Sequence, residues 1–206
     1  MCIFVLLSLY YVAIDILGFY PGMITADSID QISQTLSGQY VNHHPIFSTL
    51  LIKLWLSFAK LFSTDLQFGI FCYIVFQIIL FSSVIAYAVI TVYEFTSSRV
   101  IVAILLGILL FSPVILKYTL VMWKDVIFAI FVLLFFVSFF RFIFNIGRSK
   151  FLNGLLMVFG GLGFCVLRSN GIIAFAVTSI LLIIMFWKKN NMRKIFIGLL
   201  CISCLS

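Results

Sequence analysis

Long apolar runs, each nearly as long as a bilayer is thick, recur along almost the whole chain of 206 residues. A helix needs about 20 predominantly apolar residues to cross the hydrocarbon core of a membrane. Seven runs approach that length, and the last of them is incomplete. They are Cys2–Tyr20, Gln67–Tyr93, Val100–Leu116, Val126–Phe144, Leu152–Leu167, Ile172–Trp187 and Ile195–Ser206. The sequence therefore predicts an all-α, polytopic transmembrane helix bundle with about seven spans.

The composition excludes a soluble globular domain. Hydrophobic residues make up 65% of the chain and charged residues only 9%, which is more apolar surface than a soluble core can bury. The net charge of +7 does not indicate a nucleic-acid partner, because the basic residues fall between apolar runs, as in the cytoplasmic loops of membrane proteins. The first run contains Asp15 and lacks a basic start, so we interpret it as a retained helix and not a cleaved signal peptide. A chain that stops inside an apolar run also has the pattern of a fragment.

A further apolar run, Ile46–Phe62, decides the topology. Its polar residues form one helical stripe, which is typical of a helix lying in the membrane interface. The stripe consists of Thr49, Lys53, Ser57 and Lys60. If this helix does not span, every strongly basic loop falls on the cytoplasmic side, in agreement with the positive-inside rule. We therefore expect one transmembrane domain over residues 1–206, with a cytoplasmic N-terminus, a first span at 2–20, an external loop with two interfacial helices at 21–66, and the remaining spans at 67–206.

The external loop holds a polar stretch from Thr25 to Pro45 that carries two acids and both histidines of the chain. Within it, the pattern of residues 26–36 predicts a short amphipathic helix that stops at Gly38. Its expected apolar face contains Ile29, Ile32 and Leu36, and its expected water-facing side contains Asp27, Asp30, Gln31 and Gln34. The topology places four further polar residues on the same side of the membrane, namely Lys124, Asp125, Arg168 and Asn170. Titratable groups gathered at helix ends of a membrane protein indicate a functional site.

Four short motifs in these segments resemble those of a known group of membrane proteins. The motifs are D-S-x-x-Q at Asp27–Gln31, N-H-H-P at Asn42–Pro45, W-K-D at Trp123–Asp125 and L-R-S-N-G at Leu167–Gly171. A transmembrane helix, a loop with an early acid, a short amphipathic helix, a histidine-proline step and an interfacial helix resemble the N-terminal module of the GT-C glycosyltransferases. The motifs look most like an uncharacterised bacterial membrane-protein family that forms a distant branch of that superfamily.

The resemblance implies a function on the outer face of a bacterial plasma membrane. A sugar would pass from a polyprenyl-phosphate-linked donor to a cell-envelope acceptor. Asp27 matches the loop acid that serves as base or metal ligand, which leaves a divalent metal open as a cofactor. His44, with His43 as the substitute, would orient the acceptor or Asp27. The expected substrate-binding residues are Asp30, Gln31, His43, Lys124, Arg168 and Asn170, of which Arg168 and Lys124 would hold the phosphate.

Each assignment has a structural alternative. Asp27 is equally well placed to cap the short helix, and the histidines are also explained as interfacial polar residues. Lys124 is also explained as part of a helix-start pair, and Arg168 as a side chain that reaches the head groups. Two other functions stay open, a non-catalytic or truncated membrane subunit and a lipid or polysaccharide transporter. For a transporter, the glycines at 160, 161 and 163 are the only suggestive helix break, while Asp15 is expected to be a satisfied polar contact.

Overall fold

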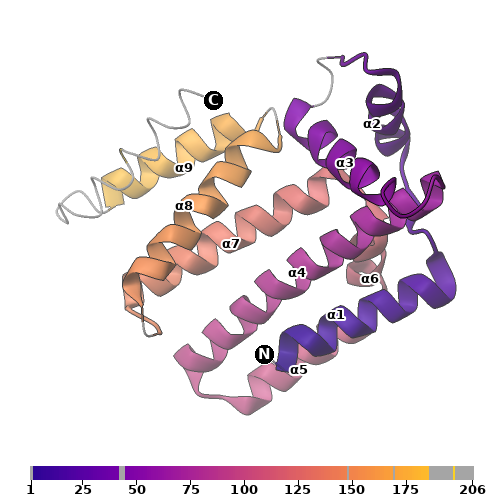
Figure 1. Cartoon of the computed structure of the whole chain (residues 1–206). Helices are drawn as coiled ribbons and strands as arrows, with labels where there is room; N and C mark the ends of the chain where they lie inside the picture. The colour runs from indigo at the N-terminus through magenta and orange to yellow at the C-terminus, as the bar shows by residue number, and fades with distance from the viewer. Residues whose placement is uncertain (1, 42–44, 148, 169, 186–196, 198–206) are drawn as a thin grey trace. The chain divides into compact units, whose positions relative to one another are not determined.

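The computed structural model describes residues 2–41, 45–147, 149–168, 170–185 and 197, and it is all-α apart from one short strand pair (Figure 1). Its helices are α1 (Cys2–Ile14), η1 (a π-helix, Asp15–Phe19), α2 (Ala26–Ser37), α3 (Ile46–Ala59), α4 (Leu66–Thr96), α5 (Arg99–Phe111), α6 (Pro113–Leu120), α7 (Lys124–Phe144), α8 (Lys150–Val166) and α9 (Gly171–Met185). The strands are β1 (Met23–Ile24) and β2 (Val121–Met122). The chain forms two compact units, Met1–Ile130 and Phe131–Ser206, and α7 crosses the boundary between them.

Three helical segments of the described chain are long and apolar enough to cross a membrane, as expected of a membrane protein. They are Cys2–Phe19, Leu66–Thr96 and Lys124–Phe144, and a fourth span is added if the bent pair α5 and α6 is counted as one. The predicted number of about seven spans is not confirmed. The predicted spans at 152–167 and 172–187 correspond to α8 and α9, which belong to the shorter apolar helices of 10–17 residues. The predicted last run lies almost entirely outside the described residues.

The predicted span Val100–Leu116 is not one continuous helix. It breaks between α5 and α6, whose axes differ by 61°. Ser112 adopts an extended conformation at the break and caps α6, because its side chain accepts a hydrogen bond from the N–H of Ile115 at 3.4 Å. Pro113 has no N–H, so the carbonyl of Leu109, four residues earlier, loses its helical partner. The hydroxyl of Tyr11 donates to that carbonyl at 2.6 Å and replaces the missing bond.

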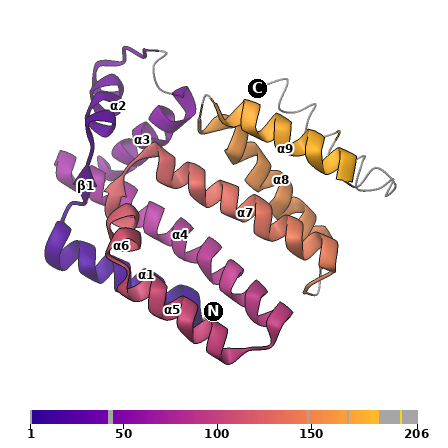
Figure 2. The same ribbon diagram turned by 180° about the vertical axis from the view of Figure 1, so that it is seen from behind.

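The core of the first unit forms where α1 and α4 lie side by side (Figures 1 and 2). Leu7, Tyr11 and Asp15 follow one another at four-residue spacing and are all fully buried. A spacing of four residues keeps side chains on one face of a helix, so this stripe is the packed face of α1. The ring of Tyr11 packs edge-on against Phe81 of α4, with 5.7 Å between centroids. The expectation that Asp15 is a satisfied polar contact is wrong for the described residues, since neither of its carboxylate oxygens has a hydrogen-bond partner there.

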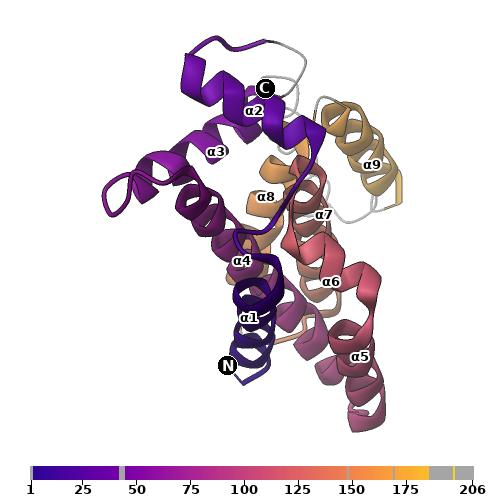
Figure 3. The ribbon, with the colours of Figure 1, turned by 90° about the vertical axis from the view of Figure 1, so that its right-hand side faces the viewer.

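Helix α2 packs on α3 with a different face from the one predicted (Figure 3). Its buried residues are Ser28, Gln31 and Ile32, while Ile29 and Leu36 are exposed. Gln31 was expected to face water, but its amide nitrogen donates to Ser48 Oγ at 2.7 Å and to Thr49 Oγ1 at 3.1 Å. These hydrogen bonds offset the cost of burying a polar side chain. Thr49 is therefore buried and does not belong to an exposed polar stripe on α3. The other three residues of the predicted stripe, Lys53, Ser57 and Lys60, are exposed.

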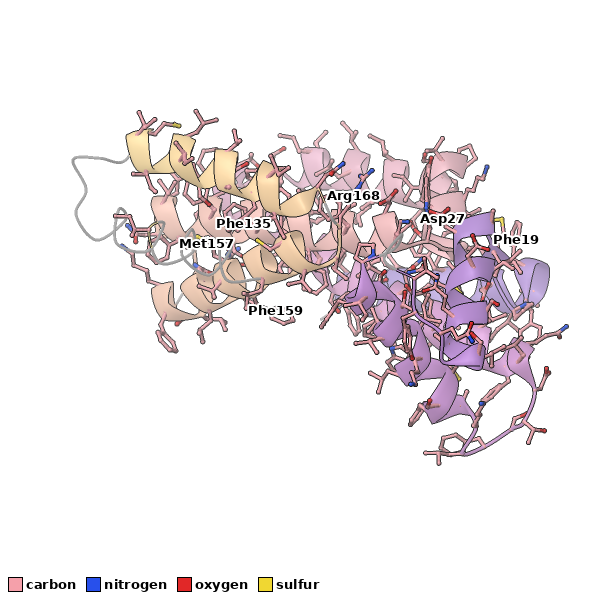
Figure 4. All side chains as sticks on the ribbon, turned by 90° about the horizontal axis from the view of Figure 1, so that it is seen from above. Phe19, Asp27, Phe135, Met157, Phe159 and Arg168 are labelled. Atoms are coloured by element: carbon pink, nitrogen blue, oxygen red, sulfur yellow. The ribbon has the colours of Figure 1, made fainter. Side chains whose placement is uncertain are left out.

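The second unit is built around aromatic side chains of α7, α8 and α9, and Figure 4 labels Phe135 and Met157 from its core. The ring of Phe135 contacts Phe164 and Phe175, with centroids 6.3 Å and 5.4 Å away. The glycines of α8 do not break the helix, contrary to the suggestion from sequence. A Cβ atom at Gly160 would lie only 2.7 Å from the backbone nitrogen of Phe135, so this glycine allows α7 and α8 to approach closely.

Candidate functional site

The short strand pair brings together two helix starts that are almost 100 residues apart in sequence. β1 and β2 pair in parallel, with Met23 opposite Val121 and Ile24 opposite Met122. Because parallel strands run in the same direction, the segments that leave them also run side by side. β1 leads into α2 after one residue, and β2 leads into α7 in the same way. The N-termini of α2 and α7 therefore meet, and the site is built there.

The cap of α2 is Thr25, so the alternative reading of Asp27 as the cap is wrong. The hydroxyl of Thr25 accepts a hydrogen bond from the N–H of Ser28 at 3.3 Å, and the hydroxyl of Ser28 accepts one from the N–H of Thr25 at 3.3 Å. This reciprocal pair is a capping box. Ser28 also donates its hydroxyl proton to the carbonyl of Met122 on β2, which ties the start of α2 to the strand pair. Asp27 is left in the first turn of α2, where the helix dipole favours a negative charge.

Asp27 forms an ion pair with Lys124, the first residue of α7. Lys124 Nζ lies 2.9 Å from Asp27 Oδ2. The side chain of Asp27 is 42% exposed and that of Lys124 is 15% exposed, so the carboxylate faces outward while the lysine stem is largely covered. The structure thus joins two of the predicted site residues, one from the candidate catalytic group and one from the candidate phosphate-binding group.

The other predicted residues of the first unit are distributed unevenly around this pair. Asp30 is exposed on α2, three residues beyond Asp27. Gln31 is 1% exposed and bonded to α3, so in this conformation it positions α2 and presents no surface to a substrate. His43 and His44 lie outside the described residues. Their expected roles stay predictions.

Arg168 and Asn170 belong to the second unit, in the connection between α8 and α9. Both residues are exposed. The carbonyl of Arg168 accepts a hydrogen bond from the N–H of Gly171 at 2.8 Å, and the carbonyl of Asn170 accepts one from the N–H of Ala174 at 3.2 Å. These bonds form at the start of α9. Figure 4 labels Asp27 and Arg168, each in its own unit, and their participation in one site stays a prediction.

Two aromatic residues near Lys124 were given no role in the sequence analysis, although Trp123 begins the W-K-D motif. The rings of Tyr118 and Trp123 stack with their centroids 5.9 Å apart and an interplanar angle of 16°. Tyr118 is 46% exposed, so a flat aromatic surface lies near the start of α7. The signal in the sequence was the pair of aromatic residues flanking β2. It was hidden because aromatic residues are common throughout this chain.

The candidate role of Asp27 as a metal ligand stays a prediction. In the described part of the chain, no group of three or more histidine, cysteine, aspartate or glutamate side chains is placed to hold an ion. Mg²⁺ and Ca²⁺ bind to several oxygen ligands, and here the carboxylate of Asp27 faces an ammonium group instead.

The chain matches no protein-family model, no curated protein and no solved structure. The resemblance to GT-C glycosyltransferases therefore stays a prediction from the sequence.

Proposed function

We propose that the protein transfers a sugar from a polyprenyl-phosphate-linked donor to a cell-envelope acceptor, with Asp27 as the base. The single observation that carries this proposal is the ion pair of Asp27 and Lys124 at the joined starts of α2 and α7. A glycosyl transfer from such a donor needs a carboxylate that accepts the acceptor proton and a cation that stabilises the departing phosphate. The pair supplies both groups within one hydrogen-bond distance.

In the proposed reaction, Lys124 exchanges its partner when the donor binds. Its ammonium group moves from the carboxylate of Asp27 to a phosphate oxygen, which takes one positive charge away from Asp27 and makes it a stronger base. The acceptor hydroxyl then gives its proton to Asp27 while its oxygen bonds to the anomeric carbon of the sugar. The bond from that carbon to the phosphate oxygen breaks, and the electron pair leaves with the polyprenyl phosphate. Lys124 balances the charge of that leaving group.

The experiment is a transfer assay with membranes that contain the full chain. Polyprenyl-phosphate hexoses and pentoses, each tritiated in the sugar, serve as donors, and the label that enters lipid-free envelope material is counted. Asp27→Asn should reduce transfer by about 100-fold to 10,000-fold, because it removes the basic oxygen while keeping the shape of the side chain.

A matched control is Asp65→Asn, because Asp65 is exposed and caps α4 through the N–H of Gln67 at 3.0 Å. Asparagine caps as well as aspartate does, so this variant should transfer at the wild-type rate. An Asp27→Asn protein with wild-type transfer, at equal abundance in the membrane, would refute the catalytic role of Asp27.

Transport of a lipid or polysaccharide is the second candidate, and the break between α5 and α6 favours it. Interrupted helices are typical of the substrate sites of secondary transporters. Movement of a labelled polyprenyl-phosphate sugar across sealed vesicles, without transfer to an acceptor, would support transport over transfer. Transfer in detergent solution, where no membrane separates two compartments, would support the enzyme.

A further inference from the structure

The carboxyl group of Asp15 is fully buried in the first unit and plays no part in the proposed transfer reaction. Asp15 is 0% exposed, and neither carboxylate oxygen has a hydrogen-bond partner among the described residues. It is also the first residue of η1, the π-helix that ends the first candidate span. Single turns of π-helix occur frequently at functional sites. An unpaired carboxylate inside a membrane protein is costly and is a functional-site candidate by default.

A second acceptor without a donor lies at the same level of the helix pair. Tyr11 contacts Phe81, and Tyr20 contacts Phe71 at 5.3 Å between centroids, so the two segments run in opposite directions. Along the chain, Asp15 lies between Tyr11 and Tyr20, and Gln77 lies between Phe71 and Phe81. Gln77 is 0% exposed, and its Oε1 atom has no hydrogen-bond partner among the described residues.

The orientation of the Gln77 amide is fixed by the end of α6 and the start of β2. Its nitrogen donates to the carbonyl of Thr119 at 3.0 Å and to the carbonyl of Val121 at 2.8 Å. Both amide hydrogens are thereby used, and rotating the amide would place an oxygen against two carbonyls. Gln77 Oε1 therefore remains an acceptor. Asp15 and Gln77 together carry three buried acceptor oxygens for which the described residues provide no donor.

The protein supplies no basic side chain from the two helices that meet here. Neither α1, η1 nor α4 contains a lysine, arginine or histidine. Near this level, the other ionisable groups of α4 are Cys72 and Tyr73, and α6 adds Lys117 and Tyr118, which are exposed. Tyr11, on α1 itself, directs its hydroxyl to the carbonyl of Leu109. The described helices that meet here therefore supply no positive charge to balance a buried carboxylate.

We propose that Asp15 is a proton-binding site inside the first unit, which holds a proton in the folded protein and shares it with the amide oxygen of Gln77. One proton suffices for this arrangement. It converts the carboxylate into a neutral acid and supplies the donor that Gln77 Oε1 lacks. The site is independent of the proposed sugar transfer, since it uses neither Asp27 nor Lys124.

The test is infrared spectroscopy of the purified full chain in lipid nanodiscs at neutral pH. A protonated carboxyl group has a C=O stretching band that is separate from the bands of carboxylates and of the backbone, and that shifts in D₂O. The wild-type protein should show the band of one such group. Asp15→Asn should remove it, and Asp65→Asn should retain it, because Asp65 is exposed.

Gln77→Leu tests the partner of the proton. The band should remain and move to higher frequency, since a carboxyl group that no longer donates a hydrogen bond has a stiffer C=O bond. Asparagine is neutral and close to the acid in shape, so Asp15→Asn should also fold like the wild type. If it does not fold, Asp15→Glu serves instead, because glutamic acid should shift the band without removing it.

Three results would overturn the proposal. The first is a wild-type spectrum without the band at neutral pH, and the second is a band that Asp15→Asn leaves unchanged. The third is a band that disappears when sodium chloride replaces choline chloride at constant pH. That result would assign the site to an alkali cation.

Discussion

The ion pair between Asp27 and Lys124 is half open to water on the side of the carboxylate, and this exposure determines what each side chain contributes. Exposed ion pairs stabilise proteins by about 0–1 kcal/mol, because water screens the attraction and two side chains lose freedom. The fold of α2 does not depend on the pair, since Thr25 and Ser28 cap the helix and bind it to β2. We therefore expect the pair to serve the proposed function and to add little to stability.

Replacing Lys124 by glutamine tests this explanation. We expect the free energy of unfolding in detergent to fall by less than about 1 kcal/mol. Transfer of the labelled sugar should fall by roughly 100-fold, as when one group that stabilises transition-state charge is removed. Denaturant unfolding and the transfer assay give the two values on the same preparation. A large loss of stability with unchanged transfer would instead make the pair structural.

Tyr11 makes a hydrogen bond whose removal should be costly. Its hydroxyl is buried and satisfies the Leu109 carbonyl, which Pro113 leaves without a helical partner. Tyr11→Phe should lower the free energy of unfolding by about 1–3 kcal/mol, the usual cost of an unsatisfied buried acceptor. Tyr10→Phe is the matched control, because the Tyr10 hydroxyl donates to Leu110 at 2.5 Å in a partly buried setting. A larger loss in Tyr10→Phe than in Tyr11→Phe, measured by denaturant unfolding, would contradict this account.

At the scale of the elements, apolar periodicity predicted which segments are helical but not which helix faces are buried. The helix at 26–36 was correctly expected, and α2 extends from Ala26 to Ser37 with Gly38 in a left-handed conformation after it. Its buried face could not be read from hydrophobicity, because that face contains Ser28 and Gln31, whose partners lie on other elements. Pro113 was a visible break signal, but the apolar residues on both sides of it concealed the break.

The close packing of α7 against α8 gives a prediction for the glycines of α8. A Cβ atom at Gly160 would lie 2.7 Å from the nitrogen and 2.9 Å from the Cα atom of Phe135. Because both are backbone atoms, Gly160→Ala must push the helices apart, and it should destabilise the protein by about 1–3 kcal/mol.

Gly154→Ala is the matched control on the same helix. Its Cβ atom would make an ordinary contact of 3.5 Å with the side chain of Phe142. Alanine is also the better helix former by about 1 kcal/mol, so this variant should be neutral or slightly more stable. Thermal unfolding of both variants decides the comparison. Equal melting temperatures would show that the helices relax at no cost.

At the scale of the whole molecule, composition alone predicted a helical membrane protein, and the long apolar helices agree with it. The number of spans could not be counted from apolar runs, because runs of similar hydrophobicity form helices as different as α4, with 31 residues, and α9, with 15. The meeting of Asp27 and Lys124 was predicted only as a shared side of the membrane. The strand pair that joins them is two residues long, too short for the alternating pattern by which strands are recognised.

The topology of α3 gives the last prediction. Its 14 residues form a helix of about 21 Å, shorter than the roughly 30 Å of a hydrocarbon core, so α3 should not cross the membrane. Residues before and after it should then lie on the same side of the membrane.

In a chain whose five cysteines are replaced by alanine, Ser37→Cys and Thr64→Cys should both react with an impermeant thiol reagent added to intact cells. Both positions are exposed, so any difference in their labelling reports the side of the membrane and not burial in the protein. Ser97→Cys, which follows α4, is exposed as well and should react only after permeabilisation, because α4 spans. Labelling of Ser37→Cys without Thr64→Cys would show that α3 crosses, and it would place the basic loops that follow on the outer side of the membrane, against the positive-inside rule.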